Sequence, residues 1–135
     1  MTKQDMQMAF GQVTSALMQV EPYPSLNLCE LKWLVVPAIK TKQFLVVNEM
    51  LKNSSVSPAA IALWAFVGPA VDEKLHAQMA DKAPLFRLEP HDWHSGEQPY
   101  LLDLIAPAEH AIPLTQRIHR EVFNGRGYKV WRGGQ

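Results

Sequence analysis

The chain is poor in the features that mark several common classes of protein. Its 135 residues include one cysteine, Cys29, which excludes an internal disulfide framework, a paired-cysteine redox motif and a cysteine-rich zinc site. The formal net charge is zero, so nothing indicates nucleic acid as a partner. No apolar run approaches the roughly 20 residues of a membrane span, and the polar first 19 residues do not resemble a signal peptide. We therefore expect a cytoplasmic protein without a membrane span.

The length and composition predict one globular domain over residues 1–135, since 47% of the residues are hydrophobic. Charge is unevenly distributed within it. From residue 117 onward, five basic side chains stand against the single acid Glu121. This basic end could meet an acidic partner, or it could be a solvated helix end and tail.

The first third of the chain predicts two helices. Thr2 and Asp5 form a capping-box pattern before an amphipathic repeat that runs to Val20. Prolines on either side of Tyr23 favour an extended stretch there. Residues 26–36 keep helical spacing, although their last four residues also suit a buried strand, and the proline that follows would end the helix.

The rest of the chain predicts a small sheet with more helices. A long polar connection covers residues 81–98, and loops of this length in a compact domain are often functional; a short strand fits its residues 85–88. The other expected elements are strands at 42–49 and 58–67 forming an antiparallel hairpin, a helix at 70–79, a strand carrying Asp103, a helix at 108–122, a turn at 124–125 and a last strand at 128–131.

Asp103 is a single carboxylate inside an apolar run. Strict alternation along a strand would place it on one face with Leu101 and Ile105, and place Tyr100, Leu102 and Leu104 on the other. Both faces are apolar, which favours an interior strand. A charge there is costly to bury unless something binds or uses it. A structural aspartate held by backbone donors or an arginine is the alternative.

Three motifs in the same order resemble the toxin-activating lysine acyltransferases, cytosolic bacterial enzymes that fatty-acylate lysines of RTX protoxins. The resemblance covers roughly residues 20 to 123. The motifs are Val36-Pro37-Ala38-Ile39 with Gln43-Phe44, then Leu63-Trp64-Ala65, then Asp92-Trp93 with Ser95-Gly96 and Asp103 before Ile105-Ala106-Pro107.

The resemblance implies an α+β, acetyltransferase-like (GNAT-like) fold with a mostly antiparallel sheet and flanking helices, which the element order would pack on one side. It also implies acyl carrier protein as the acyl donor, an RTX protoxin as the acceptor, and a homodimer. No cofactor and no metal are expected. His91, His94 and His110 give only a weak zinc pattern, because a closed site usually draws on four ligands.

The family's catalytic pair is a histidine and an aspartate, and here only the aspartate, Asp103, matches. The histidine position falls on Tyr23, and no histidine occurs before His76. Three explanations are open: the role has moved to another histidine, with His94 the best placed; Asp103 acts alone, with a pKa raised by burial; or the protein is a catalytically lapsed relative that still binds its partners.

The donor's pantetheine arm and acyl chain would need a strand with free backbone donors and an apolar channel. Residues 62–66 are the predicted strand, and Trp64, Ala65, Phe66 and Trp93 are the predicted acyl-donor-binding residues. For Trp64, a simple place in the core is the alternative. A small-molecule N-acetyltransferase is a further reading, although the acetyltransferases' glycine-rich coenzyme A loop is not visible.

Overall fold

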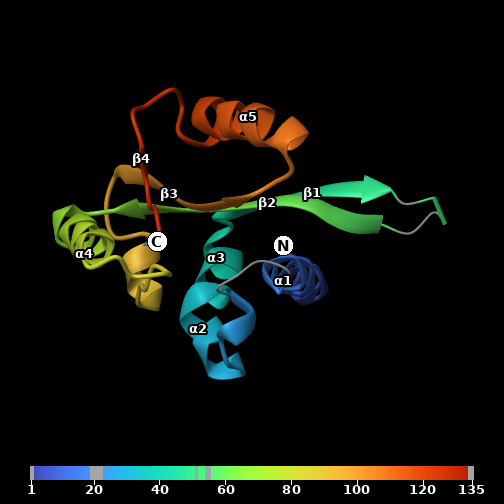
Figure 1. The fold of residues 1–135 in the computed structure, drawn as a ribbon, viewed down its shortest axis with the longest axis horizontal. Coiled ribbons are helices and arrows are strands. Elements are labelled where there is room, and N and C mark those ends of the chain that lie inside the picture. The colour runs from blue at the N-terminus through green and yellow to red at the C-terminus, as the bar shows by residue number, and fades with distance from the viewer. Residues whose placement is uncertain (1, 19–22, 51, 54–55, 134–135) are drawn as a thin grey trace.

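The computed structural model describes residues 2–18, 23–50, 52–53 and 56–133, which form one four-stranded sheet with helices around it (Figure 1). The strands lie in the order β1-β2-β3-β4. The elements are α1 (Lys3–Leu17), η1 (Tyr23–Ser25), η2 (Leu28–Glu30), α2 (Leu31–Leu34), α3 (Val36–Thr41), β1 (Phe44–Met50), β2 (Val56–Val67), α4 (Pro69–Ala80), η3 (Pro90–Trp93), β3 (Gln98–Ile105), α5 (Ala108–Arg117), η4 (Ile118–Val122) and β4 (Lys129–Val130).

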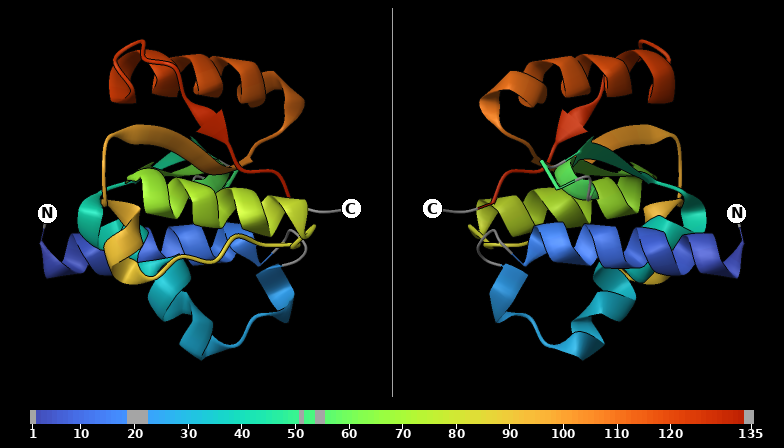
Figure 2. Two further views of the ribbon diagram at one scale, coloured as in Figure 1. Left: turned by 90° about the vertical axis from the view of Figure 1, so that its left-hand side faces the viewer. Right: turned by 90° about the vertical axis from the view of Figure 1, so that its right-hand side faces the viewer.

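Helices cover both faces of the sheet (Figures 1 and 2). Helices α1, α2 and α3 lie on one face, and α5 lies on the other. Each face has its own buried core, with Leu63 and Ala65 of β2 in the first and Ala62 and Trp64 in the second. The expectation that the helices pack on one side was therefore wrong. Because β2 and β3 are apolar on both faces, each face needs a cover.

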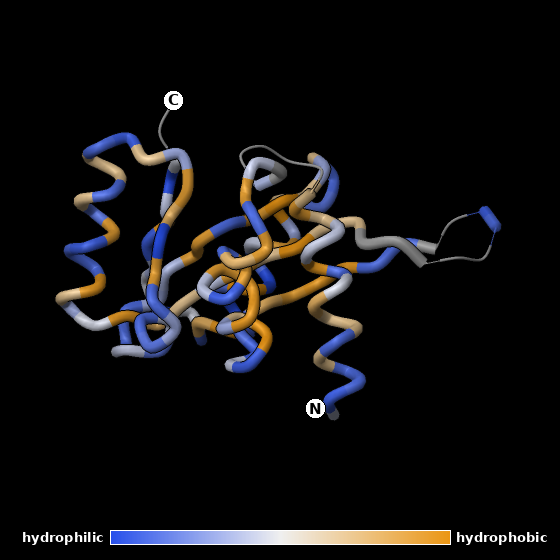
Figure 3. The backbone as a smooth tube through the Cα atoms, turned by 90° about the horizontal axis from the view of Figure 1, so that it is seen from below, coloured by the Kyte–Doolittle hydropathy of each residue, from blue (hydrophilic) through white to orange (hydrophobic). Residues whose placement is uncertain are grey.

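Apolar stretches concentrate in the middle of the molecule, along the central strands (Figure 3). The α+β class and the mostly antiparallel sheet are confirmed: β1 pairs with β2 and β2 with β3 antiparallel, while the two-residue β4 runs parallel to β3. The predicted hairpin is also confirmed, although part of its turn lies outside the described residues.

Helix α1 begins where its capping box predicts. The Asp5 amide donates to the Thr2 hydroxyl over 3.0 Å, and the Thr2 amide donates to the Asp5 carboxylate over 3.1 Å. Val13 and Leu17 are buried on its inner face. Val20, which the repeat also included, lies outside the described residues.

The segment after α1 is helical in short pieces. Tyr23–Ser25 is a 3₁₀ turn, so the extended stretch predicted at Tyr23 was wrong, and Pro24 supplies the fixed φ that such a turn accepts. The helix predicted over residues 26–36 is confirmed over its strand alternative. Pro37 does not stop the helical segment. It occupies the first turn of α3, where a backbone N–H has no carbonyl partner within the helix, so a proline is tolerated there.

The long connection between α4 and β3 packs closely against the rest of the structure. It contains no strand at residues 85–88, where Phe86 and Leu88 are buried. The buried carboxylate of Asp92 accepts from Lys74 Nζ at 2.7 Å and from the Glu89 amide at 2.9 Å. The Trp93 indole donates to the Trp33 carbonyl at 3.1 Å. These contacts tie η3 to α4 and α2.

The chain after β3 largely matches its prediction. The helix expected over residues 108–122 consists of α5 followed by the π-helical turn η4, whose Ile118 carbonyl accepts from the Phe123 amide at 3.0 Å. Asn124 and Gly125 have φ values of 55° and 76°, which confirms the turn. β4 then brings the chain back beside β3.

We expect a glycine at position 96 to be necessary for the stability of the connection between α4 and β3. A Cβ at this position would lie 2.7 Å from the Val67 carbonyl carbon and closer still to the Gly68 nitrogen, both backbone atoms that cannot yield cheaply. We expect Gly96→Ala to lower the free energy of unfolding by about 2 kcal/mol or more, measured by urea denaturation. Gly11→Ala is the matched control, because a Cβ there meets nothing within 4 Å, and we expect it to stabilise helix α1 by about 1 kcal/mol. Equal stabilities for both variants would contradict the close packing.

Candidate active site

A bulge in β3 decides where Asp103 points. Leu63 of β2 lies opposite Asp103, but the next residue, Trp64, lies opposite Leu101, so that Leu102 is an extra residue. Two successive residues, Leu102 and Asp103, then face α1–α3, while Leu101 faces α5. The predicted grouping of Asp103 with Leu101 was therefore wrong, because strict alternation fails at a bulge.

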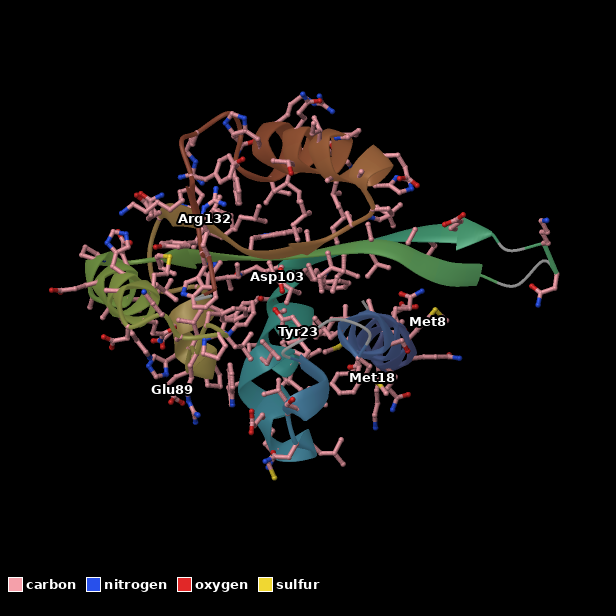
Figure 4. All side chains as sticks on the ribbon, viewed as in Figure 1. Met8, Met18, Tyr23, Glu89, Asp103 and Arg132 are labelled. Atoms are coloured by element: carbon pink, nitrogen blue, oxygen red, sulfur yellow. The ribbon has the colours of Figure 1, made fainter. Side chains whose placement is uncertain are left out.

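Tyr23 and Asp103 meet under the sheet, although they are 80 positions apart in the chain (Figure 4). The Tyr23 hydroxyl donates a hydrogen bond to Asp103 Oδ2, and the Leu104 amide donates to Oδ1 at 2.8 Å. The Tyr23 side chain is buried and Asp103 is half-buried. The two residues that the motif resemblance predicts at the positions of the catalytic pair are thus direct partners in this structure.

The surroundings of this pair move both pKa values upward. Burial raises the pKa of Tyr23, and the negative charge of Asp103 raises it further, so that the phenol keeps its proton at physiological pH. Burial also raises the pKa of Asp103 above its ordinary range, while hydrogen bonds from Tyr23 and the Leu104 amide act in the opposite direction. The pair therefore combines a neutral O–H donor with a carboxylate that accepts a proton more readily than a surface aspartate.

His94, the expected substitute for the missing histidine, is bonded elsewhere. Its Nδ1 lies 3.1 Å from Gln43 Oε1, and Gln43 Nε2 donates to the carbonyls of Trp64 and Trp93 at 2.9 and 2.8 Å. Because an amide oxygen only accepts, Nδ1 of His94 is the donor in this hydrogen bond. Within the described residues no hydrogen bond joins a histidine to Asp103, and the catalytic role of His94 stays a prediction.

The two other histidines near the Asp103 strand in sequence are also apart from this pair. His91 is 82% exposed beside Asp92, and His110 belongs to α5 on the opposite face of the sheet. In the described part of the chain no three His, Cys, Asp or Glu side chains gather in a metal-binding arrangement.

The four residues predicted to bind the acyl donor lie on both faces of the sheet. Trp64 packs under α5, and Phe66 contacts Phe123 on the same side, with ring centroids 5.9 Å apart. Ala65 and Trp93 are buried on the face of α1–α3, which is the face of Tyr23. Their assignment to the donor stays a prediction.

An apolar pocket of about 190 Å³ lies beside Tyr23, and sequence reasoning did not identify it. Tyr23 forms part of its wall, together with side chains from the end of α1 and from residues 26–34. The sequence shows only that Leu28, Leu31 and Leu34 recur at helical spacing, and the structure adds that Leu28 is 84% exposed. An exposed leucine that continues a core repeat indicates an apolar surface with a use.

Much of the basic C-terminal segment is used in contacts within the chain. Lys129 Nζ lies 2.7 Å from Asp72, and Arg117 lies 3.0 Å from Glu121. Arg126 donates to the carbonyls of Phe123 and Glu97 at 3.2 Å. These contacts lessen the charge left for an acidic partner.

The fold and the motif residues place the chain in a known class: it belongs to the RTX toxin acyltransferase family, whose model matches residues 2–134. Its element order is consistent with the acetyltransferase-like fold that the motifs implied. None of the described helices is long and apolar enough to cross a bilayer.

A curated relative is the lysine-acyltransferase RtxC of Vibrio cholerae serotype O1 (strain ATCC 39315 / El Tor Inaba N16961), which is 29% identical over 94 residues. The match covers 68% of this chain and 55% of the relative. The chain thus spans about half the length of the curated relative it matches.

Asp103→Asn should stabilise the fold at neutral pH. A carboxyl whose pKa is raised by folding binds its proton more tightly in the folded state, so the wild type loses stability as pH rises from the ordinary aspartate pKa of 3.8 through the raised one. Asparagine has no charge to bury and escapes this loss. Urea denaturation across this pH range should show a gap that opens with rising pH and then levels off. Asp81→Asn, at an exposed carboxylate, is the control; a gap that is constant at every pH would contradict the assignment.

Proposed function

We propose that this chain transfers a fatty acyl group from acyl carrier protein to an internal lysine of an RTX protoxin in the cytoplasm. The observation that carries the proposal is the hydrogen bond between Tyr23 and Asp103, the two residues that the motif resemblance predicts as the catalytic pair. Membership of the RTX toxin acyltransferase family supports the reaction class and the toxin substrate.

Asp103 is the proposed base. A lysine side chain arrives as an ammonium ion and becomes a nucleophile only after it loses a proton. A carboxylate with an ordinary pKa is a weak base for this step, and burial improves it by raising the pKa of Asp103. The ammonium proton passes to Asp103 and then to solvent.

Tyr23 is the proposed donor to the oxyanion. The lysine nitrogen attacks the thioester carbon, a C–N bond forms, and the carbonyl oxygen becomes negatively charged. The Tyr23 hydroxyl keeps its proton because its pKa is raised. It breaks its hydrogen bond to the Asp103 carboxylate and donates one to this oxygen instead. The C–S bond then breaks, and the carrier thiolate takes the second proton that the nitrogen releases. The products are an amide and the free carrier thiol.

A catalytically lapsed relative is the second candidate function, and the identity of Tyr23 favours it. A phenol whose pKa is raised cannot take a proton at neutral pH, so Tyr23 does not replace a histidine base. Such a protein would bind acyl carrier protein or toxin, with the homodimer that the resemblance implies, without turnover.

The transfer itself can be measured by intact-mass spectrometry. The chain is incubated with fatty-acyl carrier protein and a lysine-bearing protoxin fragment, and we expect the fragment to gain the mass of the acyl group. Asp103→Asn should abolish this gain while the protein stays folded, and Asp81→Asn should retain it. Full transfer by Asp103→Asn would refute the role of Asp103, and no transfer by the wild type would favour the lapsed relative.

Substitutions at Tyr23 separate the two candidate functions. Tyr23→Phe removes a hydrogen bond that lowers the pKa of Asp103, so the pH at which transfer is half-maximal should move upward, with a rate loss of about tenfold or more from the lost oxyanion donor. Tyr23→His restores the family's residue. A gain of two orders of magnitude or more with Tyr23→His, together with an unchanged rate for Tyr23→Phe, would indicate a lapsed site.

A further inference from the structure

We infer that the acyl chain of the donor binds in the apolar pocket beside Tyr23, with the thioester next to the phenol and the chain running outward over Leu28. The inference rests on the proposed function and adds to it the place where the fatty chain is held. Tyr23 lines the pocket and is also the hydrogen-bond partner of Asp103. A ligand in the pocket therefore touches one member of the reactive pair directly.

Three other hollows in the described residues lack this connection. A shallow apolar hollow between α1 and α3 is lined by Met6, Phe10 and Ile39. A groove at the start of α4 is lined by Gly68, Asp72 and residues 95–98, and a third hollow lies between β1 and α5, beside Val47 and Leu114. None of the three has Tyr23 or Asp103 in its lining. Among these four hollows, a ligand would touch a member of the pair in the pocket beside Tyr23.

The lining fits a hydrocarbon chain and does not fit a lysine. Leu17 and Leu34 are buried beneath it, and Leu26 and Leu31 stand half-buried around it. Its remaining polar side chains, Thr14 and Asn27, carry no charge. An ammonium ion there would lose its hydration without meeting an anion, whereas each buried methylene gains about fourfold in affinity.

The size of the pocket explains the exposed side chains at its mouth. About 190 Å³ is less than the 300 Å³ or more of a typical pocket for a small organic molecule, so a long chain would extend beyond it. Met18 and Leu28, which both line the mouth, are 65% and 84% exposed. They would cover the distal part of such a chain, which accounts for two large apolar side chains in water at one site.

A charge at the mouth tests the inference. Leu28→Asp changes a side chain that makes little contact with the fold, and we expect it to raise the KM for long-chain acyl carrier protein by about tenfold, with little effect on a four-carbon acyl donor. Ile112→Asp, at a 68% exposed position on α5, is the matched control and should change neither KM. An equal effect of Leu28→Asp on both donors, or none on either, would overturn the inference.

A second measurement does not depend on turnover. Acyl carrier protein loaded with a fatty acid that carries a photoreactive diazirine near its end is irradiated with the Asp103→Asn protein, and the cross-linked peptides are identified by mass spectrometry. Cross-links within residues 14–34 support the pocket. Cross-links confined to the α4 groove or to the hollow between α1 and α3 overturn the inference but leave acyl transfer intact. The absence of any cross-link, together with no transfer by the wild type, overturns both.

Discussion

The hydrogen bond between Tyr23 and Asp103 is the interaction on which the site depends. A carboxylate on an interior strand loses much of its hydration, and it must be neutralised or supplied with donors. Here one donor comes from its own strand, the Leu104 amide, and the other from a segment 80 positions away. The second donor ties the turn after α1 to the sheet. The same contact therefore orders the site and closes one side of the apolar pocket.

The direction of Asp103 follows from one extra residue in β3. Without the bulge, Asp103 would share the face of Leu101 and would lie under α5, far from Tyr23. Gln43 comes just before β1 and lies beside Trp64 of β2: its backbone carbonyl accepts from the Trp64 amide at 3.2 Å, and its side-chain amide donates to the Trp64 and Trp93 carbonyls. Backbone groups of Trp64, which lies beyond the first paired residue of β1, thus receive partners from a buried glutamine. The Gln43 side chain also joins Trp93 to this central strand.

Most of the fold could be predicted from local sequence patterns, whereas features that depend on contacts between residues far apart in the chain could not. The capping box at Thr2, the glycine turn at residue 125 and the leucine spacing before Pro37 each depend on neighbours within a few residues, and each was interpreted correctly. The second helical cover was indicated by the apolar residues on both faces of the central strands, but the bulge depends on how strands pair, which no local pattern records. For the site, the motif resemblance predicts Asp103 and Tyr23 at the positions of the catalytic pair, but sequence motifs do not show that the two side chains touch. The pocket was missed for the same reason, since its walls come from separate segments.

The proposed base, Asp103, and the proposed acyl-chain pocket both depend on the exclusion of water around Tyr23. Burial raises the pKa of Asp103, and the surfaces that exclude water from it include the Tyr23 wall of the pocket. An acyl chain in the pocket would displace water from the other side of that wall, and further loss of hydration favours the neutral form of a carboxyl group. Asp103 would then be a stronger base when the donor is bound than when the pocket is empty. Under the proposed function, a tyrosine where the resemblance predicts a histidine would then still leave the site a base, because the bound donor would strengthen the Asp103 carboxylate.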